Sequence, residues 1–183
     1  MTTTIRSLKS FKTPLRYPGG KSRACKKMEP FFPDLRYYDA YYEPFLGGGS
    51  VALHITKKYP KLKIVVNDLY EPLYNFWLQL QVNGDYVHTE LQQLKSRFPD
   101  RGSARGLFED AKEKLYDLDI TDKDRAVCFY IINKCSFSGL TESSSFSEQA
   151  SDANFSMRGI DKLPVYSKLI RNWYIRMLII NIC

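Results

Sequence analysis

The run YYEPFLGGGS at positions 41–50 combines residue types that can hold a nucleoside. An aromatic segment ends in an acid, Glu43, and is followed by three glycines and a serine that can begin a helix. Glycine tolerates positive φ and lets the backbone approach a ligand closely, because no Cβ intervenes. A strand, a glycine turn and a helix in this order fit a nucleoside at the carboxyl end of a parallel strand. A glycine run alone fits a plain loop equally well, so the neighbouring segments decide.

Two further segments carry groups that suit such a ligand. In IVVNDL at 64–69, Asp68 would end a strand about 25 residues after Glu43, where a carboxylate can accept hydrogen bonds from both ribose hydroxyls. An Asn-Asp turn is the alternative role for Asp68. In PLRYPGGK at 14–21, Lys21 follows two glycines at an expected helix start, where amides and a cation can meet a carboxylate.

The segment GGKS at positions 19–22 also matches part of a phosphate-binding loop. That loop requires a glycine five positions before the Gly-Lys pair, whereas position 15 is leucine. The strand that should precede it is short and is broken by Pro14. These departures argue against a nucleotide hydrolase.

Together the three segments resemble the Dam-type (D12 class) family of DNA adenine-N6 methyltransferases. The family shows an aromatic-x-Gly-Gly-Lys segment, then Glu-Pro-Phe-x-Gly-x-Gly-Ser, then an acid that ends the next strand. All three occur here in that order, and the resemblance extends over roughly residues 12–172. It implies methyl transfer from S-adenosylmethionine to adenine N6 in double-stranded DNA, as in restriction-modification systems.

The resemblance also implies roles for individual residues. Tyr17 packs against the cofactor, with ordinary core packing as the alternative, and Lys21 lies on the side of the methionine carboxylate. Glu43 orders the glycine turn or meets the methionine end, and Phe45 lies near the cofactor or fills the core. The expected cofactor-binding residues are Tyr17, Gly19, Gly20, Lys21, Glu43, Phe45, Gly47, Gly49 and Asp68.

The run NKCSFSGL at positions 133–140 resembles the start of the family's DNA-recognition insertion. It implies DNA contacts by Lys134, Phe137 and Ser138, with Phe137 inserted among the bases. The family often has a second basic residue shortly after the Gly-Leu pair, whereas this chain has Glu142. Without the resemblance, residues 136–159 read as a surface loop pinned by its phenylalanines.

The family's catalytic motif, Asp-Pro-Pro-Tyr, does not occur in this sequence. Its acid and a carbonyl accept hydrogen bonds from the adenine amino group, and its aromatic stacks on the flipped base. No two prolines are adjacent here, and Leu163 stands where an acid would precede Pro164. We therefore expect no catalytic residue in these 183 residues and a chain inactive alone, through an early stop, a frameshift or a gene split. The alternative is a non-catalytic fragment that binds cofactor or DNA, or a subunit completed by a second polypeptide.

The elements that position these residues predict an α/β fold. It consists of a partial Rossmann-like methyltransferase sheet, lacking several of the usual strands, and a mainly helical DNA-recognition insertion. Alternation of strands and helices favours a parallel sheet with right-handed crossovers. The expected strands cover residues 37–43 and 62–66, and the expected helices cover residues 21–32, 50–58, 73–81, 86–97, 103–118 and 122–134, the last capped by Thr121.

We divide the chain into three regions. Residues 1–85 form the cofactor-binding half with a basic arm, residues 86–165 the helical target-recognition region, and residues 166–183 a truncated return toward the catalytic half. Residues 1–28 hold eight Lys or Arg and no acid, within a net charge of +7, which favours a polyanionic partner over a merely solvated arm.

Four cysteines without a Cys-x-x-Cys pair and two histidines give no metal site, and they suit a reducing cytosol. No apolar run reaches about 18 residues, so we expect no membrane segment and a cytoplasmic protein, in a prokaryotic or phage-infected cell.

Overall fold

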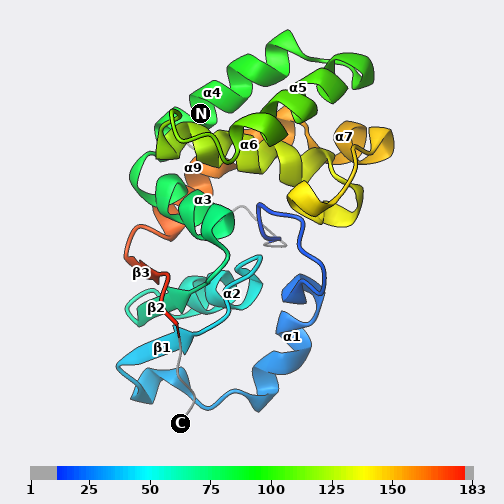
Figure 1. Cartoon of the computed structure of the whole chain (residues 1–183). Coiled ribbons are helices and arrows are strands. Elements are labelled where there is room, and N and C mark those ends of the chain that lie inside the picture. Colours follow the sequence, from blue (N-terminus) through cyan, green and yellow to red (C-terminus); the bar gives the residue numbers. More distant parts are fainter. Residues whose placement is uncertain (1–11, 180–183) are drawn as a thin grey trace.

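The computed structural model describes residues 12–179 of the chain, and it places a small parallel sheet beside a helical layer (Figure 1). The strands are β1 (Ala40–Glu43), β2 (Lys63–Asn67) and β3 (Trp173–Arg176), in the order β1-β2-β3. Both pairs are parallel, with Tyr41 opposite Ile64 and Ile64 opposite Trp173. The parallel sheet among helices confirms the predicted α/β class.

The central strand β2 is buried along most of its length, as a nearly continuous apolar run in a parallel sheet should be. The first strand is shorter than predicted, since it begins at Ala40 rather than at residue 37. Residues Leu35–Tyr37 form a 3-10 turn instead, and the Asp34 carboxylate caps it by accepting a hydrogen bond from the Arg36 N–H. The tyrosine-rich pattern did not reveal this local cap.

Two helices follow β1 and β2 at nearly the predicted bounds. Helix α2 (Ser50–Lys58) begins directly after the glycine turn, and α3 (Glu71–Val82) carries Pro72 in its first turn, where proline is tolerated. The prediction of a single helix over residues 21–32 was wrong. This segment is divided into a 3-10 turn at Lys21–Arg23, α1 (Cys25–Met28) and a 3-10 turn at Glu29–Phe31 that contains Pro30, which lacks an amide hydrogen.

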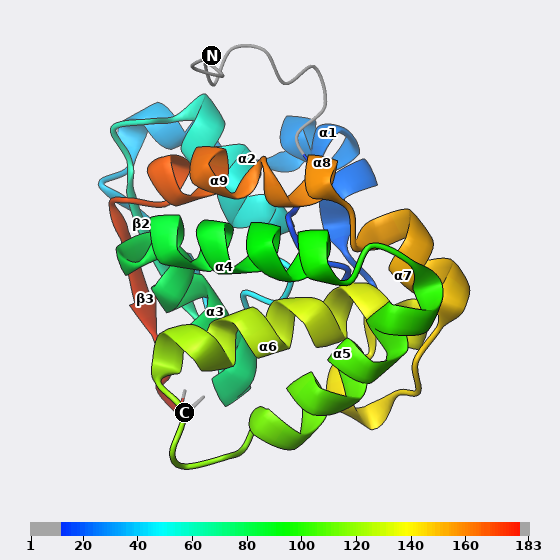
Figure 2. The ribbon, with the colours of Figure 1, turned by 90° about the horizontal axis from the view of Figure 1, so that it is seen from above.

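The remaining helices form a helical layer that packs against α3 and lies to one side of the sheet. They are α4 (Gly84–Arg97), α5 (Arg101–Lys114), α6 (Asp122–Cys135), α7 (Glu148–Asn154), α8 (Met157–Ile160) and α9 (Leu163–Leu169). Helix α6 runs through the middle of this layer (Figure 2), and residues 126–135 are all buried. A helix that is enclosed on all sides is typical of a core element. Its cap is the predicted one, since the Thr121 hydroxyl accepts from the Asp124 N–H at 3.3 Å.

One hydrophobic core extends from the sheet into the helical layer. Phe76 of α3 stacks on Tyr130 of α6 at a ring separation of 5.9 Å, and Trp77 packs against Trp173 of β3 at 5.7 Å. Residues 166–183 were predicted as a return, and their described part contains β3, which lies alongside β2. No helix among residues 12–179 is long and apolar enough to span a membrane.

The segment between α6 and α9 is more ordered than a loop. It contains 3-10 turns at Phe137–Gly139 and Thr141–Ser143 besides α7 and α8. Phe155 is completely buried and Phe146 packs on Phe108, so two of its phenylalanines fix the segment to the core. Phe137 is 61% exposed, which leaves it available for contact with a partner.

The start of α2 yields a stability prediction. Gly49 has φ of +68°, and a Cβ there would lie 2.7 Å from the Trp77 ring. Gly49→Ala should therefore lower the free energy of unfolding by about 2–5 kcal/mol, through left-handed strain and overpacking. Gly106→Ala is the control, because Gly106 faces open space within α5 and alanine there should stabilise by about 0.5–1 kcal/mol. Urea denaturation of both variants tests this, and equal midpoints would contradict it.

Candidate functional site

The carboxyl ends of β1 and β2 bring together the glycine turn and Asp68. The Leu46 N–H donates to the Asn67 carbonyl oxygen at 2.8 Å, and the Gly47 N–H donates to Asp68 Oδ2 at 2.8 Å. Gly47 and Gly49 both have positive φ, as the tight turn requires. The predicted motif residues from two separate segments therefore meet at one edge of the sheet.

Tyr17 lies directly on this turn. A Cβ added at Gly47 would lie 2.8 Å from the Tyr17 ring, and one at Gly48 would lie 2.8 Å from the Tyr17 Cβ. The Thr13 hydroxyl donates to the Gly48 carbonyl oxygen, which anchors the same segment. Tyr17 is 44% exposed, so it covers the turn without being ordinary core.

Asp68 has acceptor capacity to spare. Besides the Gly47 N–H on Oδ2, its Oδ1 accepts the Tyr70 N–H at 3.1 Å. A carboxylate offers about four lone-pair sites, so about two remain for the two hydroxyls of a ribose. The side chain is partly exposed, and this geometry fits the carboxylate–diol pairing that the sequence predicted.

The Gly-Gly-Lys segment is exposed beside Tyr17. Gly19 has φ of +71°, and the Gly20 N–H donates to the Tyr17 carbonyl oxygen at 2.9 Å, which closes a turn. Lys21 Nζ donates to the Gly19 carbonyl oxygen at 2.9 Å in an exposed contact. Because only a 3-10 turn follows, the expected helix N-terminus is not available to a carboxylate. Lys21 can contribute its ammonium charge alone.

Glu43 and Phe45 have different surroundings. The Tyr41 hydroxyl donates to Glu43 Oε2 at 3.2 Å. Burial raises the pKa of Glu43 to about 7, although bonds from Tyr41 and from the Ala52 backbone oppose the shift. Because Ala52 lies in the first turn of α2, Glu43 connects the strand end to that helix, which favours the role of ordering the turn. Phe45 is 72% exposed, so it does not fill the core.

Two residues of the site were not predicted. The buried Asn67 amide donates to the Pro44 carbonyl oxygen at 3.2 Å and to the Leu178 carbonyl oxygen at 3.1 Å, and it accepts the Leu178 N–H at 2.7 Å. It thereby joins the segments that follow β1 and β3. The Trp77 indole N–H donates to the Gly47 carbonyl oxygen at 3.2 Å. The sequence did contain a signal for Asn67, because it is a polar residue at the end of a buried apolar strand. The Asn-Asp pair itself indicated only a possible turn.

The expected DNA-binding residues are divided between surface and core. Phe137 is exposed, and the neighbouring Ser138 has φ of +53°, an uncommon conformation for a residue other than glycine. Lys134 is only 8% exposed, with Nζ 5.1 Å from the centre of the Tyr130 ring. Burial, and next the positive charge of Arg16, lower the pKa of Lys134 to about 7. A direct phosphate contact by Lys134 stays a prediction, and this burial weighs against it.

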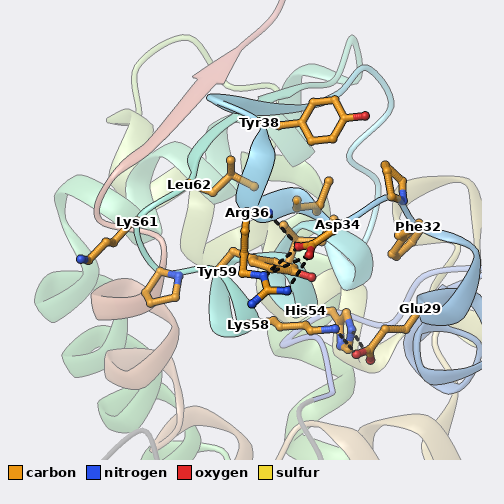
Figure 3. Close-up of a pocket in the computed structure, with 14 residues that line it drawn as sticks. Glu29, Phe32, Asp34, Arg36, Tyr38, His54, Lys58, Tyr59, Lys61 and Leu62 are labelled. Carbon is orange, nitrogen blue, oxygen red and sulfur yellow. Dashed lines mark hydrogen bonds and ion pairs between the residues drawn. The ribbon is translucent and has the colours of Figure 1, made fainter.

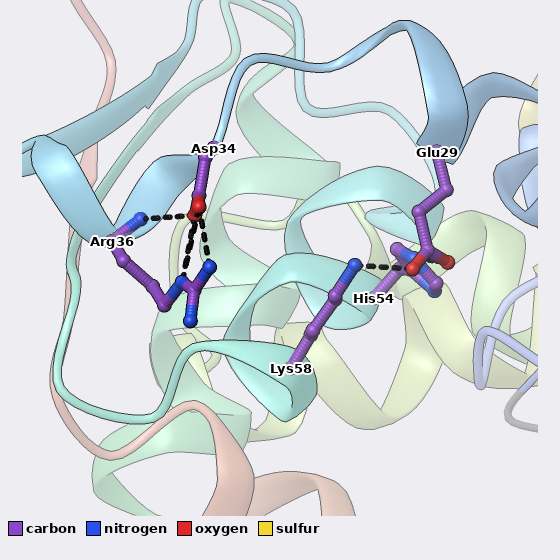
Figure 4. Close-up of polar contacts among 5 residues, drawn as sticks. All are labelled: Glu29, Asp34, Arg36, His54 and Lys58. Carbon is purple, nitrogen blue, oxygen red and sulfur yellow. Dashed lines mark hydrogen bonds and ion pairs between the residues drawn. The ribbon is translucent and has the colours of Figure 1, made fainter.

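A wider hollow of about 840 Å³ lies at the opposite end of the sheet, beside the residues that precede β1 and β2 (Figure 3). Two groups of ion pairs lie in it (Figure 4). Arg36 pairs with Asp34 at 2.6 Å, and Lys58 and His54 both pair with Glu29. None of the motif residues lines it. A smaller pocket of about 270 Å³ lies between Tyr17 and the loop after α6, and Tyr70 and Thr141 also line it.

Within residues 12–179, no group of three or more His, Cys, Asp or Glu side chains is arranged to hold a metal ion. The described cysteines, Cys25, Cys128 and Cys135, are buried and free. Burial raises the pKa of the Cys128 thiol to about 11. These thiols therefore behave as core side chains.

A known protein family matches most of this chain. A model of the D12 class N6 adenine-specific DNA methyltransferases matches residues 17–177. The chain belongs to this family. It is also similar to the type II methyltransferase M.MjaIII of Methanocaldococcus jannaschii, with 27% identity over 139 residues that cover 69% of this chain and 46% of the relative. The chain thus spans about half the length of that relative, and the resemblance seen in the sequence is confirmed.

Glu43 predicts a pH dependence of stability. Its folded pKa of about 7 lies above the unfolded value of about 4.3, so the folded state holds an extra proton between these pH values. The stability that this provides is present below about pH 4.3 and is lost as the pH rises through about 7. In Glu43→Gln, which has no carboxyl group to titrate, the free energy of unfolding should fall less between these pH values. Tyr41→Phe should extend the decrease to higher pH, because it removes a bond that favours the charged carboxylate. Urea unfolding from pH 4 to 8 measures both, and wild-type pH profiles in the two variants would contradict the assignment.

Proposed function

We propose that this chain binds S-adenosylmethionine and double-stranded DNA as part of a DNA adenine-N6 methyltransferase. The observation that carries the proposal is the assembly of Tyr17, the glycine turn and Asp68 at the carboxyl ends of β1 and β2. Nucleoside ligands bind at this end of the strands in open α/β sheets. Membership of the family supplies the reaction class.

In this proposal, each motif residue meets a different part of the cofactor. The two remaining acceptor sites of Asp68 bind the ribose hydroxyls, and the glycine turn allows close approach of the backbone. Tyr17 and the exposed Phe45 supply aromatic contact, and Lys21 offers its charge to the methionine carboxylate. When bound, S-adenosylmethionine supplies the methyl group on a sulfonium.

The proposed DNA contacts begin at the loop after α6. Phe137 is exposed there and can insert among bases, with Ser138 beside it. The net charge of +7 favours phosphate contacts, which would weaken with added salt. Part of the basic arm proposed for this role, residues 1–11, lies outside the described residues.

The strand order supports a proposal for where a catalytic strand would pair. β2 is paired on both sides, whereas β1 and β3 each have an unpaired outer edge among the described strands, and β1 is the strand that leads into the glycine turn. Tyr42 on β1 is 65% exposed. We propose that a strand ending in Asp-Pro-Pro-Tyr, from a second polypeptide or from further sequence, pairs with the outer edge of β1. Its carboxyl end would then adjoin Glu43 and the glycine turn, because parallel strands end at the same side of a sheet.

Cofactor binding is tested at Asp68. Asp68→Asn keeps the side-chain shape but removes the charge, and charge-assisted hydrogen bonds are about twice as strong as neutral ones. The variant should therefore bind S-adenosylmethionine roughly 10- to 100-fold more weakly in calorimetry. Lys58→Ala alters the wider hollow at the other end of the sheet and is the control. Loss of binding in Lys58→Ala with wild-type affinity in Asp68→Asn would move the site to that hollow.

The 183-residue polypeptide should not methylate DNA by itself. The adenine amino group is a poor nucleophile, and acceptors aimed at it stabilise the charge that develops in the transition state. Loss of one such group commonly costs about 100- to 1000-fold in rate, and here the whole motif is missing from the sequence. Transfer of tritium from labelled cofactor to an adenine-containing duplex should remain at the level of a heat-killed control. Addition of a polypeptide that carries the Asp-Pro-Pro-Tyr strand should raise it.

Transfer by the unsupplemented chain would refute this expectation and would require an acid within it. Asp152 and Asp161 are the first to substitute. Asp152 pairs with Arg101 at 2.7 Å, and Asp161 accepts from Gln92 Nε2 at 2.8 Å. Asp152→Asn and Asp161→Asn would then separate the two candidates.

A further inference from the structure

A buried asparagine joins the helical region to the cofactor segment. Asn133 lies in the last turn of α6 and is 1% exposed. Its side chain pairs with both backbone groups of Arg16, a residue 117 positions earlier in the chain. The Arg16 N–H donates to Oδ1 at 2.9 Å, and Nδ2 donates to the Arg16 carbonyl oxygen at 2.7 Å. A side-chain amide thus serves as the hydrogen-bonding partner of an extended backbone.

Arg16 also supports the loop that follows α6. Its guanidinium donates to the Ser136 carbonyl oxygen at 2.6 Å. Gly139 packs so closely that a Cβ there would lie 2.7 Å from the Arg16 Cβ. Because Arg16 directly precedes Tyr17, whose ring covers the glycine turn, the same residue contacts the loop and begins the cofactor segment.

A second connection joins the same two regions. The Tyr70 N–H donates to Asp68, and the Tyr70 hydroxyl lies 3.3 Å from Thr141 Oγ1. Thr141 and Ser138 both have positive φ, at +56° and +53°. Such conformations cost energy in residues other than glycine and persist where the surroundings hold them. The contact between Tyr70 and Thr141 therefore helps to hold the loop against the cofactor segments.

We propose that Asn133 is a positioning residue that, through Arg16, fixes the loop at residues 136–141 to the cofactor segment. DNA held by the loop and cofactor held beside Tyr17 then favour the same arrangement, so each ligand strengthens binding of the other. Thermodynamic linkage makes this coupling reciprocal. The inference rests on the proposed function, from which it takes both ligands.

The test compares the affinity of the chain for S-adenosylhomocysteine with and without a short adenine-containing duplex. In the wild type, the duplex should tighten binding about fivefold or more. In Asn133→Ala this gain should fall below about twofold, because both bonds to the Arg16 backbone are lost. Asn75→Ala is the matched control, since Asn75 is also buried and its amide joins α3 to Asp122 at 2.8 Å without contacting Arg16. The gain should survive there.

A second variant keeps the test decisive if Asn133→Ala does not fold. Arg16→Met retains the backbone pair, removes the bond to Ser136 and alters a partly exposed side chain. This variant should also reduce the increase in affinity that the duplex causes. A separate measurement on the wild type is amide hydrogen exchange, which the duplex should slow at residues 13–21.

The outcomes separate this inference from the proposed function. If the wild type binds both ligands but the duplex does not raise its affinity for S-adenosylhomocysteine, the coupling is overturned and the proposed function stands. The same conclusion follows if Asn133→Ala and Arg16→Met both keep the full increase in affinity. A wild type that binds neither ligand overturns both.

Discussion

The glycine turn holds the site together because Gly47, Gly48 and Gly49 have no side chains. Other parts of the protein pack into the space that side chains would need. A Cβ at Gly47 would lie 2.8 Å from the Tyr17 ring, and one at Gly49 would lie 2.7 Å from the Trp77 ring, both too close for an unshifted side chain. The Trp77 indole then donates to the Gly47 carbonyl oxygen. A side chain in the turn would separate the N-terminal segment, the sheet and α3 from one another. Close backbone approach, which glycine alone permits, is therefore used first by the protein itself.

The features predicted correctly are those that short-range chemistry determines. Residues a few positions apart determine the bounds of α2 and the Thr121 cap of α6. Parallel strand geometry brings Asp68 to the glycine turn. Where a local competitor was overlooked, the boundaries moved. Pro30 divides the expected first helix, and Asp34 caps a 3-10 turn where a strand was expected.

The features that sequence could not supply depend on distant partners. Asn67 bonds to a residue 111 positions away, and Asn133 to one 117 positions away, so the hydrogen-bonding partner of neither can be read from the neighbouring sequence. The burial of Lys134 has the same origin. A lysine beside an exposed recognition loop looks like a phosphate contact in the sequence, but α6 is enclosed on all sides and includes it in the core. Burial of this kind is decided by packing rather than by residue type.

The pairing of β2 with β3 has a consequence for the order of folding. Ile64 lies opposite Trp173, so the central strand meets its second neighbour only after all the helices from α3 to α9 have been synthesised. The Trp173 indole also donates to Thr56 of α2 at 2.7 Å, which closes the core beneath the sheet. Contacts between residues so far apart form slowly, because a long segment must first be closed into a loop. On the ribosome, β2 therefore stays open on that side until residues 173–176 emerge, and the sheet is completed after the helical layer can already have formed.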